Sequence, residues 1–167
     1  MKYLYLIRHA KSSWSDPDLV DFDRPLNKRG RKNGPVMAKR MALRGIKPDI
    51  IISSPAKRAK KTARYMSLGT GYKRRDIIYL KELYLGTKSH YLDIIANAFR
   101  ENDVLFLVGH NHIITDLADY LTGECFVNVP TCGIVGMKFP GKIGFNKRAK
   151  SGIFVFFDYP KKVVGKI

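Results

Sequence analysis

Histidine and arginine side chains follow three separate apolar runs of the sequence, close to the point where each run ends. Arg8 and His9 come directly after the first run, Arg58 follows the second by a few residues, and His110 follows the third. Planar guanidinium groups pair with the spread negative charge of a phosphoryl group through two parallel hydrogen bonds. A neutral imidazole is a nucleophile that can hold a phosphoryl group transiently. These residue types together indicate phosphoryl-transfer chemistry.

His9 is the side chain that this chemistry needs as its nucleophile. Positive charge on Arg8 and Arg58 would oppose protonation of His9 and keep its ring neutral near pH 7. A backbone carbonyl that accepts a hydrogen bond from one ring nitrogen would aim the other nitrogen at phosphorus. His110 could donate a hydrogen bond to an equatorial oxygen and stabilise the transition state. Ser54 stands before a predicted helix, whose free N–H groups could help to bind the anion.

The order of the elements predicts an α/β fold in a single domain over residues 1–167, with a mostly parallel central sheet and helices on both faces. Near-continuous apolar runs, typical of strands buried on both faces, occupy residues 3–7, 49–53 and 103–108. More alternating segments, predicted as late edge strands that could run antiparallel, occupy residues 133–139 and 152–158. Apolar residues recur at helical spacing in residues 27–44, 56–68, 88–100 and 113–121. Ligands bind at the carboxyl ends of the strands in such a sheet, so we expect the histidines and arginines to meet there.

Two local features add detail to this expectation. Pro35 lies inside the helical segment 27–44, so either the helix breaks there or Pro35 occupies the first turn of a second helix. Cys125 and Cys132 are expected to be free, buried thiols rather than a disulfide, which suits a reducing compartment.

The charge of the chain is its unusual compositional property. Lys and Arg number 31 against 14 Asp and Glu, which gives a formal net charge of +17. The excess gathers at residues 57–64, 73–75 and 147–150. Such a field attracts polyanions of any kind, including nucleic acids, acidic proteins and phosphorylated substrates. A basic module that binds nucleic acid or a phosphoprotein without turnover is therefore an alternative of another class, although it leaves the two histidines unexplained.

Four ordered sequence elements resemble the histidine phosphatase superfamily, whose members have the phosphoglycerate mutase-like α/β fold. Residues 6–10 (LIRHA) are similar to its Arg-His-Gly signature. Residues 53–63 (SSPAKRAKKTA) resemble its Ser-Pro-x-x-Arg-x-x-x-Thr element, and residues 109–111 (GHN) resemble its second-histidine element. Residues 23–30 (DRPLNKRG) resemble the Arg-Pro-Leu-(Ser/Thr/Asn)-x-x-Gly segment of the SixA-like branch, the phosphohistidine phosphatases. The order of these matches over most of the chain makes the resemblance specific.

The resemblance implies a role for each matched residue. His9 would be the nucleophile that forms a phosphohistidine intermediate, and Arg8, Arg58 and His110 would complete the phosphate pocket. Glu82 lies where many relatives carry a carboxylate after a strand, and it would be the general acid for the leaving group. To donate a proton, Glu82 must be protonated near the working pH, which requires a raised pKa.

The chain departs from the family pattern at two places near the expected pocket. Ala10 stands where glycine is commonest, and His112-Ile113 stands where relatives often have Pro-Gly. The rim of the pocket can therefore differ in shape from that of relatives. The chain also has no long insertion that could cap the site. A short, uncapped, basic site suits a phosphohistidine on a protein, whereas a small-molecule phosphomonoesterase or mutase of the same superfamily is the alternative.

The sequence also bounds cofactors, partners and location. His110 and His112 could ligate a metal ion together, but no acidic or cysteine partner is evident, so neither a metal nor another cofactor is expected. The expected partner is a phosphorylated protein or a small phosphate ester; nucleic acid is not favoured, and the oligomeric state is open. No apolar run approaches the roughly 20 residues of a membrane span, and the start does not read as a signal peptide. We therefore expect a cytoplasmic location.

Overall fold

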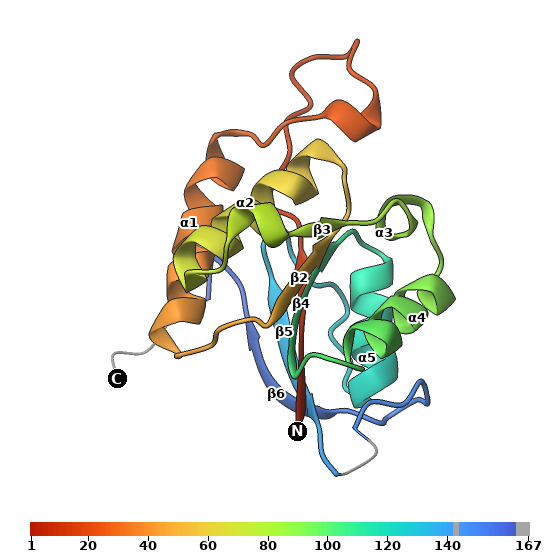
Figure 1. Ribbon diagram of the computed structural model, residues 1–167. Coiled ribbons are helices and arrows are strands. Elements are labelled where there is room, and N and C mark those ends of the chain that lie inside the picture. Colours follow the sequence, from red (N-terminus) through yellow and green to blue (C-terminus); the bar gives the residue numbers. More distant parts are fainter. Residues whose placement is uncertain (142–143, 163–167) are drawn as a thin grey trace.

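The computed structural model describes residues 1–141 and 144–162, which form a six-stranded sheet with helices packed on both of its faces (Figure 1). The strands are β1 (Lys2–Arg8), β2 (Ile50–Ser53), β3 (Ile78–Tyr79), β4 (Val104–Gly109), β5 (Ile134–Phe139) and β6 (Ile153–Asp158). The helices are α1 (Lys28–Leu43), α2 (Lys57–Thr70), α3 (Glu82–Leu85), α4 (Lys88–Ala98) and α5 (Ile113–Thr122), with single 3-10 turns at Asp21–Asp23 and Arg74–Asp76. The predicted α/β fold is confirmed.

The sheet has the order β3-β2-β4-β1-β5-β6. Strands β3, β2, β4 and β1 run parallel to one another, whereas β5 is antiparallel to β1 and β6 is antiparallel to β5. The mostly parallel sheet with antiparallel late strands is therefore confirmed. Because β1, β4 and β2 are adjacent and parallel, the segments that follow them emerge at the same end of the sheet.

Two hydrophobic clusters explain why the strand segments are apolar without alternation. On β1, Leu4 and Leu6 point to the side covered by α4 and α5, whereas Tyr5 and Ile7 point to the side covered by α1 and α2. Successive side chains of a strand point to opposite faces, so a strand buried on both faces needs an apolar residue at every position. The two helix pairs lie on opposite sides of the sheet (Figure 1).

Helix α1 continues through Pro35, so both interpretations of this proline were wrong. Proline removes one helical N–H donor and leaves the carbonyl of Arg31 without its partner. Both residues are exposed, so water can solvate that carbonyl. At the start of α1, the side chain of Asn27 accepts a hydrogen bond from the backbone N–H of Gly30 at 2.9 Å, which caps the helix.

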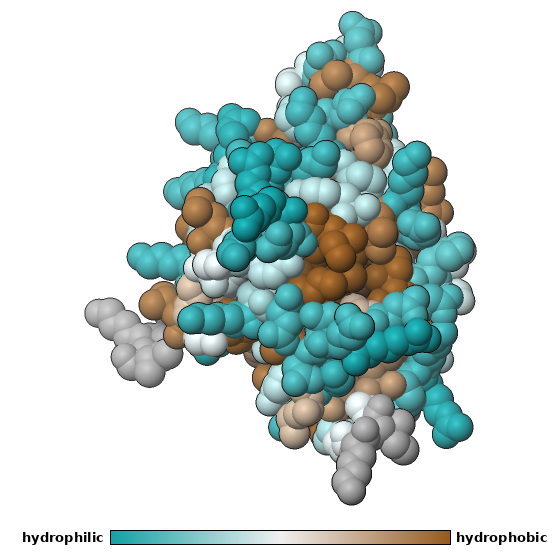
Figure 2. Space-filling model, viewed as in Figure 1, coloured by the Kyte–Doolittle hydropathy of each residue, from teal (hydrophilic) through white to brown (hydrophobic). Residues whose placement is uncertain are grey.

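Some short or exposed features differ from the expectation. Strand β3 and helix α3 were not predicted, since two and four residues are too few to show a period. The prediction that both cysteines are buried is wrong for Cys125, which lies exposed in the loop after α5, and correct for Cys132. Figure 2 shows apolar residues gathered beside β3, where Ile78 is exposed at the sheet edge. Among the described residues, no helix combines the length and the apolar character needed to cross a membrane.

Candidate active site

A pocket of about 410 Å³ opens where the central parallel strands end. Arg8 ends β1 and His9 follows it, His110 follows β4, and Arg58 lies in the first turn of α2 after β2. The structure brings these four predicted residues together in the pocket lining. The lining is completed by five residues to which the sequence assigned no role: Asp21, Arg24, Tyr84, Leu85 and Asn111.

His9 is oriented by the backbone next to it. Its Nδ1 lies 2.8 Å from the carbonyl oxygen of Ala10, so Nδ1 carries the proton and donates it. The lone pair is then on Nε2, which accepts a hydrogen bond from Nε of Arg58 at 3.3 Å. Burial, and next the neighbouring His110, lower the pKa of His9 to about 3 against the opposing effect of the Ala10 hydrogen bond. The ring is therefore neutral at physiological pH, and its unprotonated nitrogen is hydrogen-bonded to Arg58 in the pocket lining.

His110 lies beside His9, with 5.0 Å between the ring centroids. Its Nδ1 lies 3.5 Å from Nη2 of Arg58, which can only donate, so Nε2 carries the proton and donates to the hydroxyl of Ser54 at 2.7 Å. Burial, followed by the positive charge of Arg58, lowers the pKa of His110 to about 4. His110 is therefore also neutral near pH 7 and turns Nδ1 toward the arginine.

The two predicted arginines are held differently. Arg8 donates from Nη1 to the carbonyl of Val129 at 2.7 Å, while its buried Nε has no hydrogen-bond partner among the described residues. Arg58 donates from Nη1 to the backbone carbonyl of Asp21 at 2.6 Å and from Nη2 to the Asp21 carboxylate at 2.9 Å. Both arginines line the pocket and place positive charge where an oxyanion would bind.

Asp21 is a pocket residue that the sequence analysis missed. Its carboxylate accepts hydrogen bonds from Arg58, from Arg24 and from the hydroxyl of Tyr84, each at 2.9 Å. Partial burial acts to raise the pKa of Asp21, but the hydrogen bonds from Arg58, Tyr84 and Arg24 outweigh it and lower the pKa to about 2. Asp21 is therefore ionised at neutral pH and occupies part of the hydrogen-bonding capacity of Arg58.

Glu82 does not join the other four predicted residues. It is the exposed first residue of α3 and lies outside the pocket lining, to which Tyr84 and Leu85 of the same helix contribute. Glu82 thus makes no contribution to the lining, although it lies only three positions before Leu85 on the same short helix.

The segment after β1 is fixed to the two neighbouring helices. The hydroxyl of Thr62 on α2 accepts from the backbone N–H of Ala10 at 2.9 Å and donates to the carbonyl of Arg58 at 2.8 Å. On α1, a Cβ atom added to Gly30 would lie 2.2 Å from the carbonyl oxygen of Lys11, so only glycine permits this close approach. These contacts hold the backbone around His9 in one position. Within the described ranges, no three His, Cys, Asp or Glu side chains gather to hold a metal ion.

Comparison with known proteins identifies the family. The model of the histidine phosphatase superfamily (branch 1) matches residues 4–94. The proposed phosphohistidine phosphatase SixA of Agrobacterium tumefaciens has a similar structure, with a TM-score of 0.80 and 29% identity over 95% of this chain and 99% of that one. The protein histidine phosphatase SixA complexed with tungstate shares the fold, with a TM-score of 0.80 and 18% identity over 95% of this chain and 97% of that one.

A plant protein is also similar in sequence. An uncharacterized chloroplastic protein of Arabidopsis thaliana is 30% identical over 137 residues, which cover 77% of this chain. The matched region spans 62% of that protein's length. Since the family model covers more than half of the chain and the fold agrees with it, the chain belongs to the histidine phosphatase superfamily, branch 1.

Proposed function

We propose that this chain acts as a single phosphatase domain in which His9 attacks phosphorus and carries the phosphoryl group. The observation that carries the proposal is the neutral His9 ring, whose Nε2 lone pair faces a pocket lined by arginines. Nε2 exchanges its hydrogen bond from Arg58 for a bond to phosphorus, while the bond from phosphorus to the leaving atom breaks with its electron pair. Water then attacks the phosphoryl group on His9, which releases inorganic phosphate and restores the free imidazole.

Arg8, Arg58 and His110 have roles in binding the phosphoryl oxygens. The guanidinium groups of Arg8 and Arg58, which both line the pocket, supply donors for two of these oxygens. A phosphate dianion beside His110 would raise its pKa, and protonation at Nδ1 would turn this nitrogen into a third donor. Charge that develops on the oxygens in the transition state is thereby stabilised.

The proposed substrate is phosphohistidine on a protein. A phosphohistidine ring protonated at its second nitrogen leaves as neutral imidazole, so its departure requires no acid from the enzyme. An alkyl ester, by contrast, needs a proton for its leaving oxygen. Asp21, the carboxylate in the pocket lining, is ionised at neutral pH, and Glu82 lies outside the lining. The pocket therefore favours leaving groups that do not depend on a carboxylic acid.

The test is phosphate release from p-nitrophenyl phosphate and from a phosphohistidine peptide, with and without a chelator. We expect the wild type to turn over both substrates without added metal, and His9→Ala to turn over neither. His90→Gln, which removes an exposed histidine at the start of α4 but keeps an acceptor for the backbone N–H of Thr87, is the matched control and should retain the activity. Full activity of His9→Ala would show that His9 is not the nucleophile.

The same assay separates the alternatives within the family. Faster turnover of sugar phosphates than of the peptide would favour a small-molecule phosphomonoesterase or a mutase. The predicted acid role of Glu82 would appear in Glu82→Gln as a loss confined to esters with poor leaving groups. We expect this variant to hydrolyse the phosphohistidine peptide at the wild-type rate, because imidazole needs no acid from Glu82.

A further inference from the structure

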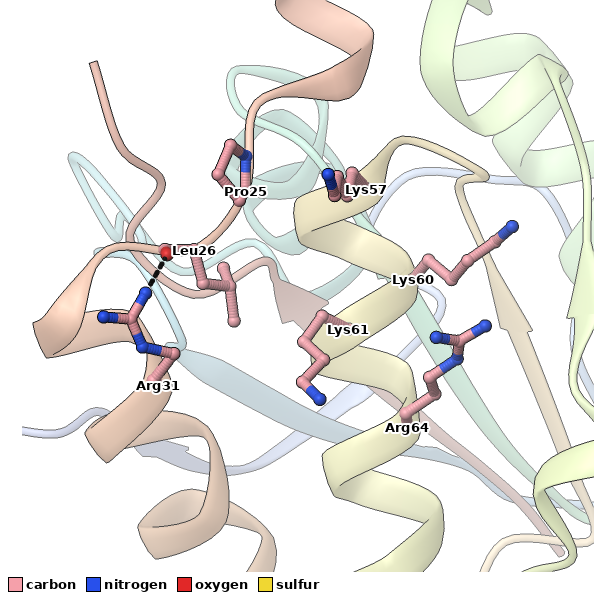
Figure 3. A pocket seen from close by; sticks show the side chains of 7 residues that line it. All are labelled: Pro25, Leu26, Arg31, Lys57, Lys60, Lys61 and Arg64. Atoms are coloured by element: carbon pink, nitrogen blue, oxygen red, sulfur yellow. Dashed lines mark hydrogen bonds between the residues drawn. The ribbon is translucent and has the colours of Figure 1, made fainter. Parts of the chain in front are cut away.

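A second pocket, of about 290 Å³, lies beside the active-site pocket, between the start of α1 and the first turns of α2 (Figure 3). We call it the basic groove. Two apolar residues, Pro25 and Leu26, contribute to its lining. The remaining lining residues are all cationic, and they are Arg31, Lys57, Lys60, Lys61 and Arg64. Figure 2 shows the hydrophilic surface that gathers over α2 on this side of the molecule.

Four of these cations share one face of α2. Lys57, Lys60, Lys61 and Arg64 are spaced three or four residues apart, so they are neighbours on the helix surface, as Figure 3 shows. Like charges at a spacing of four residues destabilise a helix by about 0.2–0.5 kcal/mol per pair. Repulsion among these cations therefore lowers the stability of α2, and an anionic ligand would offset this loss.

The five cations of the groove are not neutralised by nearby carboxylates of the described residues. Within residues 1–141 and 144–162, none of them forms an ion pair with a carboxylate. The buried Nε of Arg64 has no hydrogen-bond partner among these residues. Arg31 donates from Nη1 to the carbonyl of Leu26 at 2.7 Å, which fixes it at the groove (Figure 3). Lys60 and Lys61 lie over the rings of Tyr79 and Tyr65, at 5.0 and 5.1 Å from the ring centroids, and these contacts leave both cations without an anionic partner. The groove thus presents positive charge that an anionic ligand could neutralise.

The groove and the active-site pocket are connected through two short segments. Lys57 lines the groove, and the next residue, Arg58, lines the active-site pocket. Likewise, Pro25 lines the groove, and the preceding residue, Arg24, lines the active-site pocket. The two openings thus adjoin at the first turn of α2, a helix that with its side chains is about 10 Å across. An extended peptide rises about 3.3 Å per residue, so three or four residues would join the two sites.

We propose that the basic groove binds an acidic segment of the phosphorylated protein substrate, beginning three or four residues from the phosphorylated side chain. This inference rests on the proposed function and names the chemistry of its partner. Carboxylates would pair with the cations of α2, while Pro25 and Leu26 would contact an apolar residue of the segment. Single-stranded nucleic acid binds through aromatic stacking platforms, whereas the rings of Tyr65 and Tyr79 lie under Lys61 and Lys60 and do not line the groove, which favours a protein segment.

The test compares two phosphohistidine peptides that differ only in the segment expected to enter the groove. One peptide carries four glutamates beginning three residues from the phosphohistidine, and the other carries four glutamines. At physiological salt, which screens distant charges, we expect the wild type to prefer the acidic peptide at least tenfold in kcat/KM, through KM. Lys60→Gln/Lys61→Gln should reduce this preference to about twofold and leave turnover of p-nitrophenyl phosphate unchanged, because neither lysine lines the active-site pocket.

A control variant separates the groove from the overall charge. Lys73→Gln/Lys161→Gln removes the same charge from exposed residues outside the groove, and it should keep the wild-type preference. Equal kcat/KM of the wild type for both peptides would overturn the inference. An equal loss of preference in both double variants would also overturn it, because the preference would then arise from net charge.

A binding measurement keeps this inference apart from the proposed phosphatase activity. The dissociation constant of the unphosphorylated, fluorescein-labelled acidic peptide can be measured by fluorescence anisotropy, without turnover. If the wild type binds it and Lys60→Gln/Lys61→Gln binds at least fivefold more weakly, the groove binds acidic segments even if no substrate is hydrolysed. Tighter, groove-dependent binding of a labelled oligonucleotide of the same length would overturn the inference in favour of nucleic acid.

Discussion

The two pocket histidines should make the protein sensitive to mild acid. The pKa of His9 is lowered from 6.5 to about 3 and that of His110 from 6.5 to about 4. As the pH falls below 6.5, these histidines bind protons in the unfolded chain but not in the folded protein. The stability that comes from keeping these histidines neutral is therefore fully present above pH 6.5. It is lost as the pH falls from 6.5 toward 3–4.

The size of this effect follows from the two pKa values. A difference of one pKa unit between the folded and unfolded states corresponds to about 1.4 kcal/mol, so each histidine should cost about 2 kcal/mol between pH 7.5 and pH 5. The two together should lower the free energy of unfolding by about 4 kcal/mol, a large part of the stability of a small domain. The ionised Asp21, whose pKa is about 2, contributes little above pH 5.

Urea unfolding at pH 7.5 and pH 5, in buffers without phosphate, measures this difference directly. His9→Gln/His110→Gln should lose most of it and unfold at nearly the same urea concentration at both pH values. The double variant is the decisive one, because His110 is one of the causes of the lowered pKa of His9 and a single substitution would change both contributions. His90→Gln removes an exposed histidine and should show the wild-type difference. If the double variant lost as much stability in acid as the wild type, the lowered pKa values would be wrong.

Three further substitutions test the support of the site. Thr62→Val leaves the backbone N–H of Ala10 without its acceptor; it should cost about 1–3 kcal/mol of unfolding free energy and lower kcat, whereas Thr62→Ser should restore both. Gly30→Ala forces a Cβ atom against the carbonyl of Lys11, and calorimetry should find a loss of about 1–3 kcal/mol; an unchanged stability would contradict the close approach. Asp21→Asn removes a carboxylate that competes with phosphate for an arginine, so inorganic phosphate should inhibit more strongly, while unfolding changes by less than about 1 kcal/mol. Weaker inhibition by phosphate would mean that Asp21 positions the arginine rather than competing for it.

The long elements and four site residues could be predicted because their signals are local. Strands β1, β2 and β4 are runs of mostly apolar side chains, and the polar site residues stand at or after the end of each run. The parallel arrangement then brings Arg8, His9 and His110 to one end of the sheet, and Arg58 follows from its position after β2. Knowledge of the sheet order was not needed to expect these residues together.

The remaining features depend on contacts that the local sequence does not encode. Asp21 reaches the pocket because a long irregular segment folds back onto α2, and nothing in its neighbourhood sets that path. Glu82 was expected to act as an acid from its position after a strand, but the direction of a side chain on a four-residue helix depends on how that helix packs. The exposure of Cys125 likewise depends on the loop after α5, which has no apolar period of its own.

The position of the site on the sheet has a consequence for how activity is lost. His9 and His110 extend from β1 and β4, which pair with each other in the middle of the sheet. The strands of a buried sheet separate only when the whole domain unfolds, whereas loops open at much lower free energy. His9, the proposed nucleophile, and His110 therefore cannot be disordered by local fluctuation alone. Inactivation by denaturant should coincide with cooperative unfolding of the sheet, and the site should form during refolding when β1 and β4 pair.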